Sequence, residues 1–408
     1  MIHLRPFKGY RPPQDIVSEL VSLPFDKYSK EETLQIAKFN PKSFINIIKP
    51  ELSEGKRTPP YDKKAQNKSR QKFKSFVKQG YLKQDEKPCF YIYKIIKPDF
   101  VHKGLIAAIA SEDYHNGKIK RHEQTLAKKE EKLKEYLKVV GINAEPVMFT
   151  YPFRDEIDEM IDRLSYREPE IRFHQGLDEH LIWVVNQENE VNEIKKKFEQ
   201  LDAVYIADGH HRTASSVLLS DELAKDKADH PAAAFMGIFF PNHNLRLYEF
   251  NRLLKDIGSL TPVKVLNKLK KEFHVEMVSK EQIRPENMHE FGLYIKGKSY
   301  RLTPKSRLDN QVLDADLLNE KILSPIFDVN DLRNDERVGF ISGLNGYQAA
   351  IDSVDKGDYA LAFLLYPVSF EQFFNFSDQG KIMPPKTTYF EPKLLNGLVI
   401  YDLEVDKV

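Results

Sequence analysis

Cysteine is nearly absent from the chain, because Cys89 is the one cysteine among 408 residues. A lone cysteine cannot form an internal disulfide bond. It also excludes cysteine zinc clusters, thioredoxin-type pairs and small disulfide-rich secreted folds. We therefore expect a protein of a reducing compartment, the cytoplasm.

Net charge and long apolar runs are also missing. The 62 Lys and Arg residues balance 61 Asp and Glu residues, so no overall field attracts nucleic acid or anionic lipid. Apolar stretches such as Ala232 to Phe240 fall far short of the roughly 20 residues that cross a bilayer. The opening residues Met1 to Pro6 hold no apolar signal core. We expect no membrane partner, and nucleic acid is a disfavoured one.

The composition that is present is that of a globular protein, with 41% hydrophobic and 30% charged residues. The length suggests about two or three domains. We expect an N-terminal α/β segment at residues 1–150, a core at 151–255 and a C-terminal α/β domain at 256–408.

Helical and strand patterns alternate along most of the chain, which predicts an α/β fold, of the α+β kind with mixed sheets. Residues 89–96 and 105–110 are expected to form a hairpin with Pro98 and Gly104 in its connection. The expected helices include 30–39, 123–140, 344–352 and 369–376, and the other expected strands include 204–207, 338–342 and a pair at 291–302.

Residues 51–87 are locally basic, with 11 Lys or Arg against 5 Asp or Glu. The aromatic residues Phe73, Phe76 and Tyr81 are spaced to share one face of a helix. A solvated helix with an apolar stripe is therefore favoured over a nucleic-acid patch.

The sharpest local motif is Asp208-Gly209-His210-His211-Arg212, which follows an apolar strand and opens a helix. Backbone N–H groups at a helix N-terminus and the helix dipole favour anions. Gly209 would let a ligand approach the backbone, and His211 and Arg212 would bond phosphate oxygens. We expect residues 209–212 to hold phosphate.

Two other interpretations of this motif stay open. Asp208 could merely cap the helix while the histidines pack against loops. A shared metal ion is disfavoured, since adjacent helical residues such as His210 and His211 point about 100° apart.

The motif resembles the signature of the family called "domain of unknown function 1015". The likeness extends over nearly the whole chain through further blocks in the same order, although Phe25 departs from the family's usual Tyr. These blocks are Arg5-Pro6-Phe7, Leu23-Pro24-Phe25-Asp26, Asn40-Pro41, Ser43-Phe44, Pro50-Glu51, Lys120-Arg121-His122-Glu123, Asn251-Arg252 and Met383 to Lys393.

The same motif also resembles the ParB/sulfiredoxin-like fold, including the archaeal free-serine kinase. This resemblance implies a nucleotide-binding core with large additional α/β segments. His210 stands at the position of sulfiredoxin's catalytic cysteine, which excludes thiol-based sulfinate repair.

Together these features predict a nucleotide-dependent phosphotransferase or phosphate-ester enzyme acting on a small hydroxyl metabolite, with serine or phosphoserine as candidates. ATP or ADP and Mg²⁺ are the expected cofactors. Asp208 and Glu123 are the candidate bases or magnesium ligands and should lie close together, and His211 is a third catalytic candidate. Arg252 and Lys386 would bind phosphate beside residues 209–212.

Alternatives remain at this level. The protein could be a non-catalytic ParB-like nucleotide-binding regulator, or a metal-dependent hydrolase using His122, Asp208, His210 and His211. Glu123 could be an ordinary acidic residue of a first helical turn. Lys386 and Lys393 could flank a surface turn rather than a lid. The sequence leaves the oligomeric state open, a homo-oligomer included.

Overall fold

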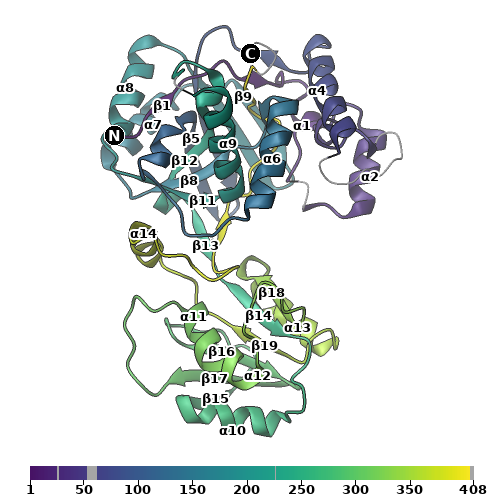
Figure 1. Ribbon diagram of the computed structural model, residues 1–408, viewed down its shortest axis with the longest axis vertical. Helices are drawn as coiled ribbons and strands as arrows, with labels where there is room; N and C mark the ends of the chain where they lie inside the picture. The colour runs from purple at the N-terminus through teal and green to yellow at the C-terminus, as the bar shows by residue number, and fades with distance from the viewer. Residues whose placement is uncertain (25–26, 53–61, 226, 405–408) are drawn as a thin grey trace. The chain divides into compact units, whose positions relative to one another are not determined.

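The computed structural model describes residues 1–24, 27–52, 62–225 and 227–404, and it divides into two compact units. The first unit comprises Met1–Leu245 and Pro392–Val408, and the second comprises Arg246–Glu391. In Figure 1 the second unit carries the green part of the chain. Phe25 and Asp26 of the family-like opening lie outside the described residues.

A mixed sheet forms the centre of the first unit. Among the described residues nine strands join it, in the order β6-β11-β8-β12-β5-β4-β10-β9, with β1 paired to β5. β11 runs parallel to β6 and β12 parallel to β8, whereas the other pairs are antiparallel. The expected α/β class with mixed sheets is confirmed. The strands are β1 Leu4–Arg5, β4 Phe90–Lys97, β5 Phe100–Ala110, β6 Ile119–Lys120, β8 Val147–Tyr151, β9 Ile171–Gln175, β10 Asp178–Val185, β11 Val204–Asp208 and β12 Ala234–Pro241.

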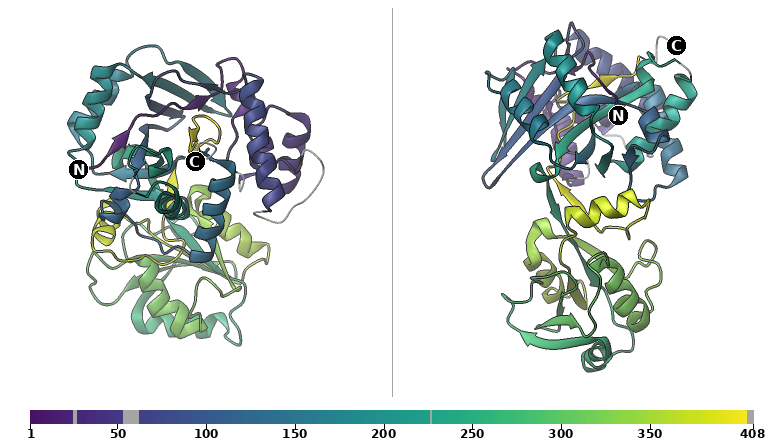
Figure 2. Two further views of the ribbon diagram at one scale, coloured as in Figure 1. Left: turned by 45° about the horizontal axis from the view of Figure 1, so that its top comes forward. Right: turned by 90° about the vertical axis from the view of Figure 1, so that its left-hand side faces the viewer.

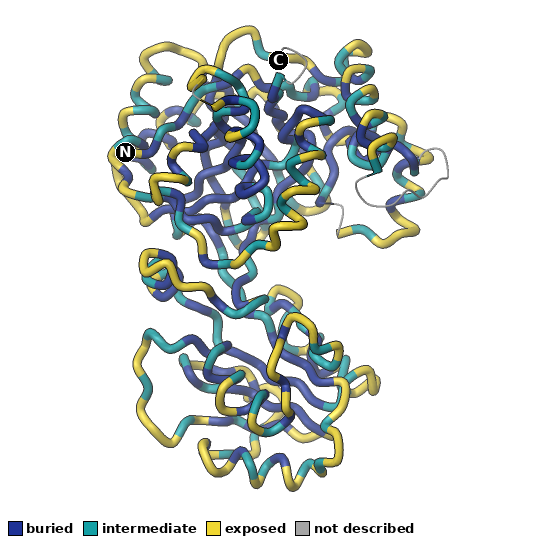
Figure 3. Tube along the Cα trace, in the orientation of Figure 1, coloured by how far each residue is buried: buried dark blue, intermediate teal, exposed yellow. Residues whose placement is uncertain are grey.

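Helices bury the apolar side chains of this sheet, and Figure 3 shows its strands as mostly buried. α9 packs on β8 and β12, and α6 lies beside α9 (Figures 1 and 2). The helices of this unit are α1 Val17–Leu20, α2 Lys30–Phe39, α3 Ile45–Ile48, α4 Lys63–Lys78, α5 Glu112–His115, α6 Ala127–Val140, α7 Asp155–Leu164, α8 Glu188–Phe198 and α9 His210–Leu223.

The basic segment forms a helix with a buried apolar stripe, as the favoured interpretation predicts. In α4, Phe73 and Phe76 are buried in a cluster with Phe44 and Ile400. The ring of Tyr81 packs edge-on against Phe76, with centroids 5.5 Å apart. Residues 53–61 of the segment lie outside the described residues.

The expected hairpin is formed by β4 and β5, but Gly104 was wrongly placed in its connection. Gly104 lies within β5, opposite Tyr93. A Cβ atom on Gly104 would come within 2.8 Å of the Phe240 ring. The glycine therefore serves close packing rather than a turn.

The expected helix over residues 123–140 starts later than its sequence predicts. α6 begins at Ala127 and ends, as expected, at Gly141, whose φ is +74°. The preceding segment follows β6 beside β11 and buries His122 against His210. That packing keeps Glu123 out of the helix, so its interpretation as a first-turn acidic residue is wrong.

The C-terminal segment of the chain returns to the first unit. β21 (Tyr401–Asp402) pairs with β7 (Ile142–Asn143), and Asn396 bridges to Ser22. A further short pair joins β2 (Tyr10–Arg11) to β3 (Lys83–Gln84). The return places residues 392–396 in the first unit with α9.

The second unit is built on an antiparallel sheet with the order β15-β17-β16-β19-β14-β18. The expected strand pair at 291–302 and the strand at 338–342 are confirmed. The strands of the second unit are β13 Arg246–Tyr248, β14 Phe250–Leu254, β15 Phe273–Val278, β16 Phe291–Ile295, β17 Lys298–Pro304, β18 Val338–Ser342, β19 Leu361–Leu364 and β20 Tyr389–Glu391, of which β13 and β20 pair with each other outside this sheet. The α-helices of the unit are α10 Pro262–Glu272, α11 Asp314–Leu318, α12 Ser324–Phe327, α13 Gly346–Asp355 and α14 Phe370–Asp378.

None of the helices in the described ranges is both long enough and apolar enough to cross a membrane.

Candidate functional site

The candidate site begins where β11 ends and α9 starts. Gly209 joins them with φ +104°, in the left-handed region that side chains disfavour. No side chain caps this helix, so the alternative of Asp208 as a simple cap is not what the structure shows. The expected strand, glycine and helix N-terminus are thus present, and their geometry suits an anion.

The Asp208 carboxylate lies between two cations. Its Oδ2 atom is 3.3 Å from Lys393 Nζ and 3.7 Å from an Arg212 guanidinium nitrogen. Partial burial alone would raise the pKa of Asp208, but Lys393, Arg212 and a backbone hydrogen bond at Gly209 outweigh it and lower the pKa below its usual value. Asp208 is therefore an ionised carboxylate at neutral pH.

Arg212 is held by main-chain and acidic partners. Its Nη1 atom donates to the Pro146 carbonyl at 2.9 Å and lies 2.5 Å from Glu145 Oε1. The guanidinium also covers Gly209, where an added Cβ would come within 3.0 Å of Nε. Glu145 therefore competes with any anion for this arginine, a partner that the sequence motif did not reveal.

His210 and His122 form a buried neutral pair. Their rings meet edge to face with centroids 4.5 Å apart. Burial, followed by the positive potential of His211, Arg121 and Arg212, lowers the pKa of His210 to about 3. Burial also lowers the pKa of His122.

The neutral His210 ring connects the helix start to Glu123. Its Nε2 accepts from the His122 backbone N–H at 3.5 Å, and its Nδ1 is 3.7 Å from Glu123 Oε2. We assign the ring proton to Nδ1, because Nε2 is the acceptor. Glu123, 43% exposed, thus stands at the same helix start as Asp208.

His211 faces the start of α6. Burial and the charge of Lys129 lower its pKa, against the opposing effect of Glu130. Its Nδ1 atom is buried and makes no hydrogen bond within the described parts of the chain. The candidate catalytic residues Asp208, Glu123 and His211 all gather around the N-terminal end of α9.

Arg252 and Lys386 belong to the second unit, where both contact Phe250. Arg252 is 1% exposed and donates to the carbonyls of Phe250 at 2.5 Å and Pro385 at 3.3 Å. Burial lowers its pKa to about 9. Lys386 Nζ lies 5.2 Å from the centre of the Phe250 ring. The structure thus brings these two candidate ligands together within the second unit.

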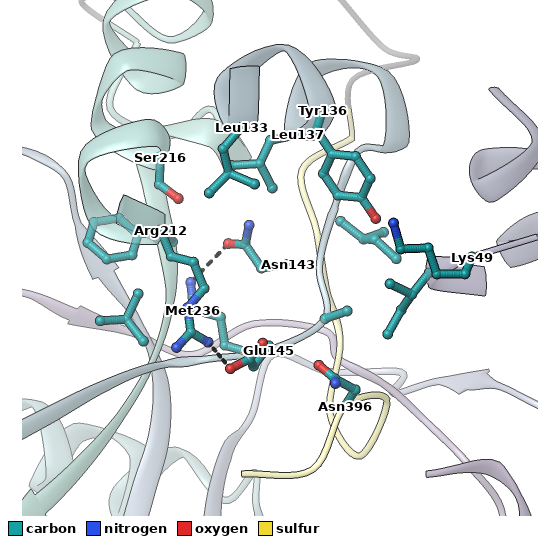
Figure 4. Close-up of a pocket in the computed structure, with 15 residues that line it drawn as sticks. Lys49, Leu133, Tyr136, Leu137, Asn143, Glu145, Arg212, Ser216, Met236 and Asn396 are labelled. Carbon is teal, nitrogen blue, oxygen red and sulfur yellow. Dashed lines mark hydrogen bonds and ion pairs between the residues drawn. The ribbon is translucent and has the colours of Figure 1, made fainter. Parts of the chain in front are cut away.

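A cavity of about 330 Å³ lies beside Arg212. Figure 4 shows Leu133 and Leu137 of α6 pointing into it, with Lys49 and Tyr136 across from Arg212. The spacing of Leu133 and Leu137, four residues apart, puts both on one face of α6. It could not reveal the cavity, because the opposite wall comes from distant parts of the chain. The remaining wall residues are Ile48, Ile142, Asn143, Ala144, Glu145, Val147, Ser216, Phe235, Met236 and Asn396.

In the ranges that the structure describes, no group of three or more His, Cys, Asp or Glu side chains is placed to hold a metal ion. The set expected for a metal-dependent hydrolase, which includes His122, Asp208, His210 and His211, forms no such group. Mg²⁺ commonly uses one or two carboxylates and takes its other ligands from phosphate and water.

Comparison with known proteins places the chain in a family. The model of the family described as "Protein of unknown function (DUF1015)" matches residues 4–325. No curated protein is significantly similar in sequence.

Only distant similarity to the following solved structures is found. A free serine kinase in complex with AMP has a TM-score of 0.37 and 17% identity, covering 76% of this chain and 95% of its own. A conserved hypothetical protein from Pyrococcus furiosus has a TM-score of 0.35 and 17% identity, with coverages of 76% and 99%. SbnI from Staphylococcus aureus, with a C-terminal truncation, has a TM-score of 0.38 and 11% identity, with coverages of 71% and 85%.

Proposed function

The chain belongs to the DUF1015 family, and we propose that it is a nucleotide-dependent phosphotransferase that acts on a small hydroxyl metabolite, with serine as the candidate acceptor. The observation that carries the proposal is the ionised Asp208 between Lys393 and Arg212 at an uncapped helix N-terminus. Phosphoryl transfer needs charge neutralisation and positioning more than covalent chemistry.

The cavity beside Arg212 suits the nucleoside of ATP or ADP. Its α6 wall is apolar at Leu133 and Leu137, while Asn143 and Asn396 supply amide groups. Ligand sites commonly combine apolar walls with a few polar groups. A nucleoside there would direct its phosphates toward Arg212 and the backbone at Gly209 to His211.

Asp208 would receive the proton of the acceptor hydroxyl. The hydroxyl oxygen forms a bond to the terminal phosphorus, the bond from that phosphorus to the bridging oxygen breaks, and its electron pair stays on the bridging oxygen. A carboxylate with a lowered pKa is a weak base, which suits a loose transition state in which the base mainly orients the nucleophile. Lys393 and Arg212 would balance the negative charge of the phosphates.

Mg²⁺ would be held by Glu123 together with the phosphates, and it would neutralise phosphate charge. Arg252 and Lys386 belong to the second unit, where Arg252 donates to main-chain carbonyls, and the proposed site is built from the first unit alone. His211, with its unsatisfied Nδ1, is the candidate donor to a phosphate oxygen.

The test is a ligand panel on the full chain. Melting temperature is measured with ATP, ADP, AMP and inorganic phosphate, each with and without Mg²⁺. A ligand at 100 times its dissociation constant stabilises by about 2.7 kcal/mol. Phosphorus NMR then follows ATP with a set of hydroxyl metabolites, serine included. Stabilisation by nucleotides and a new phosphate ester are expected. If millimolar nucleotides leave the melting temperature unchanged, the proposal is wrong.

A further inference from the structure

A second cavity of the first unit, of about 280 Å³, lies at the tip of the β9–β10 hairpin. Strand β4 ends there at Lys97, and the returning C-terminal segment supplies Lys393. Four separate parts of the chain therefore build one small enclosure. Its wall residues are Leu23, Ile95, Lys97, Gln175, Gly176, Asp178, His180, Pro392, Lys393 and Leu395.

The wall of this cavity carries both signs of charge. Lys97 Nζ and Asp178 Oδ2 lie 3.4 Å apart, and both side chains are only partly exposed. Such a pair can be exchanged for the opposite charges of a ligand, so that each protein group keeps a partner. A ligand with a single charge would satisfy one group and leave the other without its partner.

His180 gives this wall a fixed polar group. Its ring is stacked between Phe173 and Tyr93, with centroid distances of 4.9 and 5.9 Å. Its Nδ1 is 2.7 Å from the Tyr93 hydroxyl. Burial lowers the pKa of His180 to about 4, so the ring is neutral at physiological pH. The His180 ring therefore gives the cavity wall a polar group that is held in place and carries no charge.

Lys393 connects this cavity to the candidate catalytic carboxylate. The lysine lines the cavity, and its Nζ is 3.3 Å from Asp208 Oδ2. Arg212, which lines the first cavity, lies 3.7 Å from the same oxygen. The Asp208 carboxylate is thus contacted by one cation from each cavity.

We propose that the second cavity binds the phosphoryl acceptor, and that this acceptor is a small zwitterion carrying a hydroxyl group. Its ammonium group pairs with Asp178 and its carboxylate with Lys97, while its hydroxyl points past Lys393 toward Asp208. This inference rests on the proposed function. In the transfer, the hydroxyl oxygen bonds to the terminal phosphorus of the nucleotide, the bond to the bridging oxygen breaks, and the hydroxyl proton passes to Asp208.

The first test compares acceptors that differ in charge, with ATP as donor. L-serine carries both charged groups, ethanolamine lacks the carboxylate, glycolate lacks the ammonium group, and glycerol lacks both. We expect KM for L-serine to be at least tenfold lower than for each of the other three. Equal KM values for L-serine and glycerol would overturn the inference.

The second test changes the cavity. Asp178→Asn is expected to raise KM for L-serine at least tenfold with kcat within threefold and ADP affinity unchanged, and Lys97→Met should act alike. Asp178→Glu keeps the charge and should recover part of the loss. The control is Glu193→Gln, which breaks the surface ion pair of Glu193 with Arg163 and should leave KM unchanged. Unchanged KM in both cavity variants would overturn the inference.

The two proposals can fail separately. Absence of nucleotide binding would refute the proposed function, and calorimetric binding of L-serine to the wild-type and Asp178→Asn proteins would still decide the acceptor cavity. If nucleotide binds and phosphate is transferred, but KM for the acceptors does not depend on Asp178 or Lys97, the phosphotransferase proposal stands. The assignment of the second cavity to the acceptor is then wrong.

Discussion

The Lys393 ammonium group lies 3.3 Å from the Asp208 carboxylate, although 185 positions separate the two residues. The contact depends on the C-terminal segment, which returns to the first unit through the pairing of β21 with β7. A cation at this distance both lowers the pKa of the carboxylate and neutralises it beside the helix N-terminus. The pair therefore links the C-terminal segment to the proposed chemistry.

Replacing Lys393 with Met should raise the pKa of Asp208, because one of the two cations that stabilise its ionised form is removed. The acidic limb of the pH–rate profile then moves to higher pH. We also expect kcat at pH 7 to fall about tenfold, or roughly 1.4 kcal/mol of transition-state stabilisation, because Lys393 no longer balances the negative charge of the phosphates. Lys196→Met, at an exposed position of α8, is the control. A profile identical to the wild type would show that Lys393 does not act on Asp208.

Replacing Arg212 with Ala should weaken ADP binding by roughly 1.5 to 3 kcal/mol if the guanidinium makes a charge-assisted bond to phosphate. Glu145→Gln is the informative partner variant, because it releases Arg212 from its 2.5 Å ion pair. That variant should bind ADP at least as tightly as the wild type. Calorimetry on both variants decides the role, and an unchanged dissociation constant in Arg212→Ala would make this arginine purely structural.

Gly209→Ala should lower stability and nucleotide affinity together. The backbone at φ +104° strains any side chain, and the new Cβ would press on Arg212 at 3.0 Å. Gly117→Ala is the matched control, since its φ is +69° and no heavy atom lies within 4 Å of the new Cβ. Melting temperatures should fall in both variants, whereas ADP affinity should fall only in Gly209→Ala. Equal affinity in the two variants would contradict a phosphate site at this turn.

Lys386→Met tests the loop of the second unit. The change keeps most of the side-chain stem and removes the charge that lies over Phe250. We expect at most about 1 kcal/mol of stability to be lost, because the residue is exposed. A larger fall in the free energy of unfolding, measured with urea, would show that the loop depends on this cation–aromatic contact.

The motif at residues 208–212 could be predicted from the sequence because its geometry is local. A β-branched and aromatic strand, a glycine and a helix start are adjacent in the chain, and Gly209 adopts the conformation that glycine favours. Likewise the bounds of α2 and the end of α6 at Gly141 follow from neighbouring residues.

The partners of the motif could not be predicted in the same way. Glu145 and Lys393 meet Arg212 and Asp208 only through sheet pairing between distant segments, which residue spacing does not encode. The start of α6 was misplaced for a related reason. His122 is buried by His210, a long-range contact that overrides the helical pattern around Glu123.

Stability should fall as the pH drops below about 6.5, because His210 is buried in its neutral form. Its pKa is about 3 in the folded chain against an ordinary value of 6.5, so the unfolded chain binds the additional proton between these two values. The free energy of unfolding therefore rises with pH through this window, and the full contribution of His210 to it is reached above about pH 6.5. The buried His122 contributes with the same sign. Urea unfolding at pH 5 and pH 7 measures the slope.

His210→Gln should remove a large part of that slope while keeping an amide group that can still accept from the His122 N–H. His174→Gln, at an exposed position, is the control and should leave the slope unchanged. Because the folded-state pKa values of both buried histidines lie far below 7, activity near neutral pH should be insensitive to their titration. A wild-type slope retained in His210→Gln would mean that His122 or another group supplies it.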